Sequence, residues 1–475
     1  MNHIRIFKHH VPVPIAALAV LEYGVLFVSV YVAHWLRFPH EVSLATLFDV
    51  SIAPRAHAYA IVNLVCMIAI GSYKIRGAEG LTGSVLRVLV AIFLIGTIIL
   101  SAAFYLIPTL ELYFGRGVLA IAGMVALVGI CALRALFRRF AHTPQLRWGL
   151  LVVGAGKKAA RLEAALAKEE DAVGFNLMGF IPMDGVEPEV SPARLINEKL
   201  PLLDLCRKYG AQDLVVAVDE RRRSDGAQFP LHELLDCKLN GINVRDDIDF
   251  FERELGCLDI RFLSPGWLVF SEGFSFSPFR DGAERLFDVV ASSTLLLLSW
   301  PFMLAAAIAI KLEEGWSAPL IYSQERVGMG GKIFRVHKFR SMRTDAEKDG
   351  KAKWAAKNDS RVTRVGAFIR NTRIDELPQI FNVFKGDMSF VGPRPERPQF
   401  VDELTKQIPF YAERHRVKPG ITGWAQLCYP YGASAADAEG KLQYDLYYIK
   451  NHSLLFDLFI LVRTVEVILL GNGVR

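Results

Sequence analysis

The sequence predicts a membrane protein with a four-helix transmembrane N-terminal region, a Rossmann-like α/β middle domain, a re-entrant membrane helix and a small C-terminal α/β domain. Three observations support this fold class: four apolar runs in the first third, a strand–glycine–helix pattern after them, and a later apolar run broken by proline. Apolar residues make up 52% of the chain and charged residues 22%, with a mean hydropathy of +0.28. This mixture is typical of membrane helices fused to soluble domains.

The four apolar runs cover residues 11–36, 57–73, 85–107 and 117–133. Each is close to the roughly 20 residues that cross a bilayer as a helix, although the second is short. We therefore expect residues 1–140 to form the transmembrane region. Deep inside the runs the ionisable residues are Glu22 and His34, which gives little support to a transporter.

Basic residues cluster before the first run, between the second and third, and after the fourth. Under the positive-inside rule, this distribution places the N-terminus and everything after residue 134 in the cytoplasm. The residues concerned are Arg5, Lys8, Lys74, Arg76, Arg87, Arg134, Arg138, Arg139 and Arg147.

The middle of the chain has the pattern of a nucleotide-binding fold. A buried-strand run, 150–153, is followed by Gly154-Ala155-Gly156-Lys157-Lys158-Ala159 and a helical stretch. In that context glycines let a dinucleotide pyrophosphate approach a helix N-terminus. The next expected strand, 176–181, does not end in the acidic residue that holds a ribose. The sequence thus predicts a Rossmann-like domain over residues 146–262 and leaves open whether it binds a nucleotide or is structural or regulatory.

A later apolar stretch, 286–310, is broken at its centre by Ser299-Trp300-Pro301. Pro301 removes a backbone donor and is expected to kink the helix, while the Ser299 hydroxyl can satisfy freed backbone groups. A straight span would place the last third of the chain outside the cell. We therefore predict a re-entrant helix over residues 280–314 that enters the cytoplasmic leaflet and returns. The alternative is an ordinary fifth span with a proline kink.

Residues 370–398 carry the most informative pattern. Pro378 suits a first helical turn, an apolar helical face follows, and Gly386 can end the helix. This places Asp375 and Glu376 at a helix N-terminus, where the dipole favours ionised carboxylates. An ionised Asp375 can attack phosphorus to give an acyl phosphate, and the neighbouring Glu376 can bind Mg²⁺.

Three basic residues could complete a pocket that binds anions. Arg394 lies between two prolines on a stiff loop, and Lys338 and Arg340 share one face of a strand predicted within 332–343. Taken singly, the carboxylates could be a helix-capping pair and the basic strand a solvated surface. The whole ordered run is far more specific than any of its parts.

These segments resemble the bacterial polyprenyl-phosphate hexose-1-phosphate transferases, strongly over about residues 280–475. The four spans and the middle domain resemble the polytopic branch of that family. The segments that carry the resemblance are Lys338-Phe339-Arg340-Ser341-Met342, Asp375-Glu376-Leu377-Pro378-Gln379, Lys385-Gly386-Asp387-Met388-Ser389, Gly392-Pro393-Arg394-Pro395, Lys418-Pro419-Gly420-Ile421-Thr422-Gly423-Trp424-Ala425-Gln426 and Tyr444-Asp445-Leu446-Tyr447-Tyr448-Ile449-Lys450.

The resemblance implies an inner-membrane enzyme whose catalytic domain, residues 315–475, faces the cytoplasm. Such an enzyme transfers a sugar-1-phosphate from a UDP-sugar to undecaprenyl phosphate through a covalent Asp-phosphosugar intermediate, releases UMP and initiates exopolysaccharide synthesis. It implies Asp375 as nucleophile, and Glu376, with Asp375, as ligand of the cofactor Mg²⁺. It further implies that Arg394, Lys338, Arg340 and Arg370 bind substrate phosphates, and that the re-entrant helix breaks at Ser299 and Pro301.

The identity of the sugar is less constrained. We expect glucose, with galactose and an N-acetylated or diamino sugar as alternatives. The expected partners are the UDP-sugar, undecaprenyl phosphate and the lipid bilayer. A homodimer through the middle domain is compatible with the sequence. The net charge of +6 is modest and its basic residues flank apolar runs, so a nucleic acid is not an expected partner.

Two rival functions fit the sequence less well. A membrane-bound nucleotide-sugar dehydratase needs a Tyr-x-x-x-Lys pair, and none of the 14 tyrosines has lysine four residues on. A non-catalytic membrane scaffold that binds a nucleotide through residues 150–260 would have no use for the ordered segment 375–395.

Overall fold

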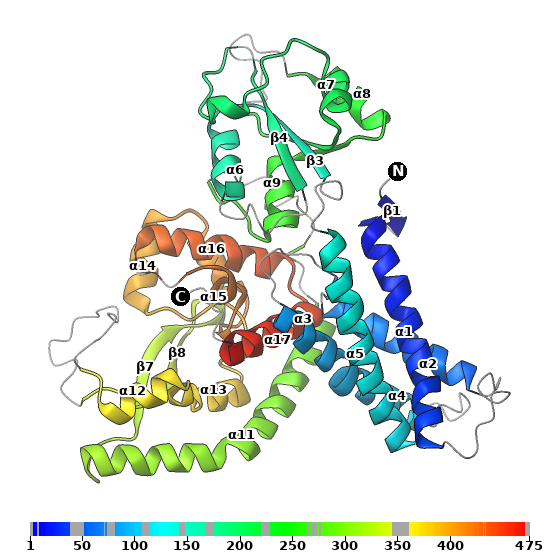
Figure 1. The fold of residues 1–475 in the computed structure, drawn as a ribbon. Helices are drawn as coiled ribbons and strands as arrows, with labels where there is room; N and C mark the ends of the chain where they lie inside the picture. The colour runs from blue at the N-terminus through cyan, green and yellow to red at the C-terminus, as the bar shows by residue number, and fades with distance from the viewer. Residues whose placement is uncertain are drawn as a thin grey trace. The chain divides into compact units, whose positions relative to one another are not determined.

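The computed structural model describes residues 3–6, 9–38, 52–70, 72–73, 81–106, 115–141, 148–167, 175–183, 185–219, 229–261, 263, 267, 271, 273–274, 277–343, 361–430, 432 and 434–470. The chain folds as two compact units, Met1–Phe250 and Phe251–Arg475 (Figure 1). The division into four domains is finer than this and stays a prediction.

The first unit begins with the membrane helices. Three stretches in it are long and apolar enough to cross a bilayer: Ala16–Arg37, Gly83–Tyr105 and Arg116–Phe137. The helix of the second predicted span has 17 residues and is the short one, as expected. The elements are β1 (His3–Ile6), β2 (His9–Pro12), α1 (Val13–Arg37), α2 (Ala53–Ala69), α3 (Leu81–Leu89), a π-helical stretch (Val90–Gly96), α4 (Thr97–Leu106) and α5 (Arg116–Ala141).

A buried ion pair joins two of these helices. In α5, Arg134 donates from Nε to Oε1 of Glu22 in α1 at 2.6 Å, and from Nη1 to the Ser84 hydroxyl at 3.0 Å. Glu22 is fully buried, and Arg134 is 6% exposed. The prediction that Arg134 lies beyond the fourth span is wrong, because α5 continues past this residue and its guanidinium neutralises the buried Glu22.

The rest of the first unit is a parallel α/β domain, as predicted. Its four-stranded sheet has the order β4-β3-β5-β6, and every neighbouring pair is parallel. Buried apolar side chains from β3 and β5 form its core, with helices packed against them. The elements are β3 (Trp148–Val153), α6 (Lys157–Ala167), β4 (Phe175–Ile181), α7 (Leu202–Tyr209), β5 (Ala211–Val216), α8 (Leu231–Leu239), β6 (Asn243–Asp246) and α9 (Asp247–Phe250).

The glycine-containing turn between β3 and α6 binds a side chain of the protein itself. Asp219, which follows β5, accepts hydrogen bonds from the backbone amides of Lys157 at 2.9 Å and Lys158 at 2.8 Å. A Cβ at Gly156 would lie 2.0 Å from the Asp219 carboxylate. The amides that would face a pyrophosphate therefore already have an anionic partner. This contact favours a structural role for the turn over nucleotide binding.

The second unit is organised on α11 (Pro278–Glu314), a helix of 37 residues that bends along its length (Figure 1). Pro301 lies inside it, and the helix continues through the proline rather than breaking into two. Ser299 donates to the sulfur of Met303 at 3.7 Å, so its hydroxyl is not the backbone partner that we expected. Only 11% of the most apolar stretch of α11 is buried by the rest of the protein. This exposure suits a helix in contact with lipid. Its re-entrant course stays a prediction.

The C-terminal half of α11 packs against the strands and helices that follow it in the second unit. Ala306 and Ile310 pack with Phe339 of β8 and Ile369 of α12. The elements are β7 (Ile321–Val327), β8 (Ile333–Phe339), α12 (Arg364–Asn371), α13 (Gln379–Lys385), β9 (Ser389–Val391), α14 (Pro398–Gln407), β10 (Gly420–Thr422), α15 (Trp424–Cys428), α16 (Ala435–Lys450) and α17 (Leu454–Leu470). Strands β7 and β8 are antiparallel, and β9 and β10 are parallel.

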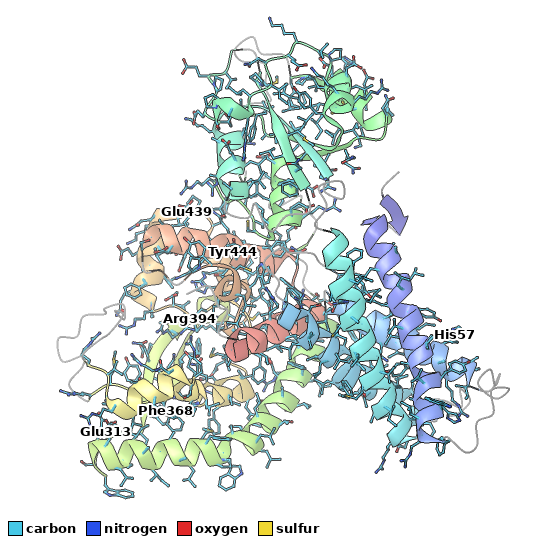
Figure 2. All side chains as sticks on the ribbon, in the orientation of Figure 1. His57, Glu313, Phe368, Arg394, Glu439 and Tyr444 are labelled. Carbon is cyan, nitrogen blue, oxygen red and sulfur yellow. The ribbon has the colours of Figure 1, made fainter. Side chains whose placement is uncertain are left out.

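The end of α11 also holds α12 in place. The Glu313 carboxylate accepts hydrogen bonds from the backbone amides of Arg364 at 2.8 Å and Val365 at 3.0 Å, which are orphan donors at the start of α12. Figure 2 labels Glu313, and also Phe368 on α12, an apolar side chain that is 63% exposed. Helix α12 is thereby fixed just before the predicted site.

Candidate active site

The predicted carboxylate pair lies in a tight turn between two helices. Asp375 and Glu376 belong to a 3₁₀ turn, Ile374–Glu376, which Arg373 enters in a left-handed conformation with φ 59°. Helix α13 follows and ends at Gly386, whose φ of 96° suits glycine. The helix and its glycine cap are confirmed. The pair precedes α13 in a turn of its own.

Glu376 forms ion pairs with two basic side chains. Its Oε1 lies 2.7 Å from Nζ of Lys338 on β8 and 3.4 Å from Nη2 of Arg394. Burial opposes ionisation of this carboxylate, but Arg394 and Lys338 outweigh burial and lower the pKa of Glu376 to about 2. Glu376 is therefore a fixed anion that holds two cations in place.

Asp375 has the opposite electrostatic character. It is 8% exposed, and burial, together with the neighbouring Glu376 charge, raises the pKa of Asp375. Lys338, Arg370 and Arg373 lower it in part. Desolvation thus opposes ionisation of Asp375, whereas at Glu376 the neighbouring cations outweigh it. Adjacent carboxylates with divergent pKa values are typical of sites that divide chemical roles.

The loop that carries Arg394 is pressed against β10. The Gly392 amide donates to the Thr422 carbonyl at 2.9 Å, and the Gly420 amide donates to the Pro393 carbonyl at 3.0 Å. A Cβ at Gly392 would lie 2.3 Å from the Lys418 carbonyl oxygen, so only glycine permits this approach. The Gly392–Pro395 segment and β10 are therefore joined by backbone hydrogen bonds, and together they hold Arg394 in place. Figure 2 labels Arg394 within the second unit.

Side chains outside the predicted site residues hold this loop through its backbone carbonyls and through Arg394. Arg414 donates from Nη2 to the Arg394 carbonyl at 3.1 Å and pairs with Asp445 at 2.8 Å. Arg326 donates to the Pro395 carbonyl at 3.0 Å, and Gln426 accepts from Nη1 of Arg394 at 3.2 Å. Asp445 and Gln426 lie in segments quoted for the family resemblance, which is the signal that could have identified them.

The remaining predicted site residues divide into two groups. Arg370 donates to the Ser341 hydroxyl at 2.8 Å and acts electrostatically on Asp375, so it belongs to the site. Arg340 lies just beyond the end of β8 and donates from Nε to the Pro319 carbonyl at 3.0 Å. Ser299 and Pro301 belong to α11 and, among the described contacts, have none with the carboxylate pair.

The donor set of the pair suits Mg²⁺. Lys338 and Arg394 both bind Oε1 of Glu376, and among the described residues no hydrogen bond reaches Oε2. Carboxylate oxygens are the ligands that Mg²⁺ prefers, usually alongside substrate phosphates. The surrounding lysine and arginines oppose a bare cation. A metal ion that arrives with a diphosphate, whose negative charge balances those cations, fits this arrangement.

Comparison with known proteins identifies similar chains. The family model described as bacterial sugar transferase matches residues 279–471. A UDP-N-acetylgalactosamine-undecaprenyl-phosphate N-acetylgalactosaminephosphotransferase of Aeromonas hydrophila is 50% identical over 199 residues, 42% of this chain and 46% of that protein. A UDP-glucose:undecaprenyl-phosphate glucose-1-phosphate transferase of Xanthomonas campestris is 44% identical over 184 residues, 38% of each chain.

One relative matches across about four fifths of the chain. An undecaprenyl-phosphate galactose phosphotransferase of Salmonella typhimurium is 30% identical over 400 residues, which is 79% of this chain and 80% of that protein. The chain spans less than half the length of the Aeromonas and Xanthomonas relatives. The family model covers the part of the chain that holds the carboxylate pair.

Proposed function

The chain belongs to the bacterial sugar transferases, and we propose that it transfers a sugar-1-phosphate from a UDP-sugar to undecaprenyl phosphate, releases UMP and initiates exopolysaccharide synthesis. The observation that carries this proposal is the contact of Glu376 with both Lys338 and Arg394 beside the buried Asp375. A fixed anion holds two phosphate-binding cations next to a second carboxylate, which is an arrangement for chemistry at phosphorus.

In the proposed first step Asp375 attacks the β-phosphorus of the UDP-sugar. A bond forms between a carboxylate oxygen and this phosphorus, and the bond from the β-phosphorus to the bridging oxygen breaks. UMP leaves with that oxygen. The sugar-1-phosphate is then attached to the enzyme as an acyl phosphate. The raised pKa of Asp375 marks a carboxylate that is weakly solvated, which favours nucleophilic attack.

In the second step an oxygen of undecaprenyl phosphate attacks the same phosphorus. The bond to Asp375 breaks, the carboxylate is regenerated, and the product is undecaprenyl-diphosphate-sugar. Lys338 and Arg394 remain beside the reacting phosphate in both steps because Glu376 holds them. Two displacements at one site predict ping-pong kinetics.

The other roles in the site follow from charge and position. Arg370 stabilises the Asp375 anion electrostatically, and Arg394 binds the diphosphate, with its loop held by Arg414. Mg²⁺ bound by Glu376 and Asp375 would neutralise the diphosphate and the departing UMP. Arg340 is expected to act at most at the rim of the pocket, since its guanidinium binds the Pro319 carbonyl.

The proposed setting is the bacterial inner membrane, with the catalytic domain on the cytoplasmic side where UDP-sugars are made. The re-entrant course of α11 and the Rossmann-like character of the middle domain belong to this proposal. The proposed donor is a UDP-hexose or UDP-N-acetylhexosamine, with glucose as the first candidate. The three relatives described above act on different sugars by name, so the donor has to be decided by assay.

The test is nucleotide release by the purified full chain, given Mg²⁺, undecaprenyl phosphate and a panel of UDP-sugars. The expected result is UMP release with one sugar by wild type and none by Asp375→Asn. The matched control is Asp402→Asn, an exposed aspartate of α14, which should keep full activity. UDP release would overturn the mechanism. A β-³²P-labelled donor without lipid should leave label on the wild-type protein, and failure to trap label would exclude the covalent step.

A further inference from the structure

A second group of buried ionisable side chains lies where α11 meets α17. It comprises Glu284 in the first half of α11, His452 in the turn before α17, and Asp457 in the first turn of α17. Nε2 of His452 lies 3.4 Å from Oε2 of Glu284 and 3.4 Å from Oδ2 of Asp457. The candidate ligand atoms of all three residues lie within 4.8 Å of one another. The proposed transferase mechanism uses none of them.

These side chains are buried, and the ring of His452 lacks hydrogen-bond partners. Exposure is 5% for the His452 side chain, 10% for Glu284 and 9% for Asp457. Neither ring nitrogen of His452 has a hydrogen-bond partner, although both are shielded from solvent. Buried imidazoles normally satisfy at least one nitrogen, so an unsatisfied ring aimed at two carboxylates indicates a missing ligand.

The charges around the cluster also indicate a missing cation. Asp288, one helical turn after Glu284, is fully buried, and its Oδ2 has no hydrogen-bond partner. Lys418 acts electrostatically on both Glu284 and Asp288. Three carboxylates, including Asp457, therefore share one lysine and one histidine. Buried carboxylates require compensating positive charge, either protons or a cation.

The distances match a particular ion. Zinc–nitrogen and zinc–oxygen bonds are about 2.1 Å long, and in a tetrahedron this length separates neighbouring ligands by about 3.4 Å. Both distances from the histidine nitrogen have this value. We propose that Glu284, His452 and Asp457 bind a divalent transition-metal ion, with Zn²⁺ the best fit. An imidazole ligand disfavours Mg²⁺ and Ca²⁺, so this site differs in kind from the carboxylate pair.

The neighbours of the ligands support the same assignment. The Tyr448 hydroxyl donates to Oδ1 of Asp457 at 2.7 Å, which leaves Oδ2 directed toward His452. Such a hydrogen bond to the non-ligating oxygen orients a metal-binding carboxylate. Oδ1 of Asp288 accepts from the Ser389 hydroxyl at 3.1 Å and the Phe390 amide at 3.3 Å, both on β9.

The ion would act as a cross-link in the catalytic unit. It joins α11 to α17, and through Asp288 the same turn of α11 is bound to β9, the strand that leads into the Arg394 loop. The membrane helix is thereby fixed to the element that positions a phosphate-binding residue. This role does not depend on the proposed transfer reaction, so metal content and thermal stability test it independently of activity.

The first experiment measures metal in tag-free full chain purified in detergent and reconstituted with zinc. We expect stoichiometric zinc after dialysis, and a fall of about 5 °C in melting temperature when a chelator removes it. Glu284→Gln and His452→Ala should lose both the zinc and the response to chelator. His232→Ala, in an exposed position of α8, should keep both. A wild type that neither holds a transition metal nor responds to chelator would overturn the proposal.

A second variant tests the same assignment if His452→Ala fails to fold. His452→Cys preserves a ligand, so its cobalt-substituted form should gain a thiolate-to-cobalt charge-transfer band that cobalt-substituted wild type lacks. Absence of this band in a folded variant that still binds cobalt would place the ion elsewhere and refute the assignment. Bound manganese or iron in place of zinc would support the site and correct the ion.

Discussion

The Nζ atom of Lys338 lies 2.7 Å from Oε1 of Glu376, the same oxygen that Arg394 approaches at 3.4 Å. One carboxylate oxygen thus brings together a strand residue and a loop residue that would otherwise repel each other. The two cations are close enough that Arg394 itself lowers the pKa of Lys338, although burial is the larger cause. Glu376 therefore assembles the positive pocket before any substrate is present.

Replacement of Glu376 by glutamine should release both cations. We expect transfer activity to fall by about 100-fold or more, and the folded state to lose about 1–3 kcal/mol, since two partly buried charges lose their partner. A double-mutant cycle with Lys338→Met, followed by thermal unfolding, measures the coupling. Strictly additive effects would show that the pair contributes nothing. Because the pKa of Glu376 is lowered to about 2, its stabilisation should be complete above about pH 5 and disappear as the pH falls toward 2.

Asp375→Asn should make the protein inactive and more stable. The folded-state pKa of Asp375 is raised, so its ionisation costs stability as the pH rises from the ordinary value of about 4 through the raised pKa. Asparagine has no such cost. Without substrate and with divalent ions removed, the melting temperature of the variant should exceed that of wild type at neutral pH and converge with it in acid. Equal melting temperatures at every pH would contradict this expectation.

The Arg414–Asp445 pair should affect substrate binding without touching substrate. Asp445→Asn leaves a buried guanidinium without its counter-charge, which costs about 3–5 kcal/mol and loosens the Arg394 carbonyl. We expect a raised KM for the UDP-sugar in the fraction that remains folded. Arg416→Met is the matched control, because Arg416 pairs with Glu413 at the surface and should change stability by less than about 0.5 kcal/mol. An unchanged KM in folded Asp445→Asn would exclude a positioning role.

The middle domain should not bind a nucleotide at its glycine-containing turn. In hydrogen exchange on the full chain, neither NAD nor a UDP-sugar should protect the amides of Lys157 and Lys158, since Asp219 already binds them. Asp219→Ala should speed exchange there and destabilise the start of α6 by about 1 kcal/mol. Asp204→Ala, in the first turn of α7, is the control and should leave exchange at Lys157 and Lys158 unchanged. Protection by a nucleotide in wild type would restore the cofactor hypothesis.

The sequence predicted those features that depend on local pattern. The helix that ends at Gly386, the parallel strands around β3 and the apolar spans follow from periodicity and from glycine and proline chemistry. The sequence could not predict long-range pairing. Arg340 follows the alternation of Lys338, but the strand ends at Phe339 and the guanidinium turns to a carbonyl. Arg414 lies in no recognisable motif, because its role depends on a backbone carbonyl of another segment.

The upward shift of the Asp375 pKa could not be predicted from the sequence, for a related reason. A helix start is visible in the sequence, whereas the depth at which a carboxylate is buried depends on how α12, β8 and the Arg394 loop meet around it. Desolvation of this kind is set by tertiary packing and commonly exceeds the effect of a helix end. Likewise, Pro301 predicts a distortion of α11 but not its extent, since neighbouring turns can keep the hydrogen-bonded helix continuous.

The ion pair between Glu22 and Arg134 constrains how the protein is made. Helix α1 leaves the ribosome well before α5, so Glu22 reaches the membrane while its partner is still unsynthesised. A lone carboxylate in hydrocarbon is costly, so we expect the nascent α1 to stay near the insertion machinery until α5 arrives. We therefore expect the membrane helices to enter the bilayer as a group rather than one by one.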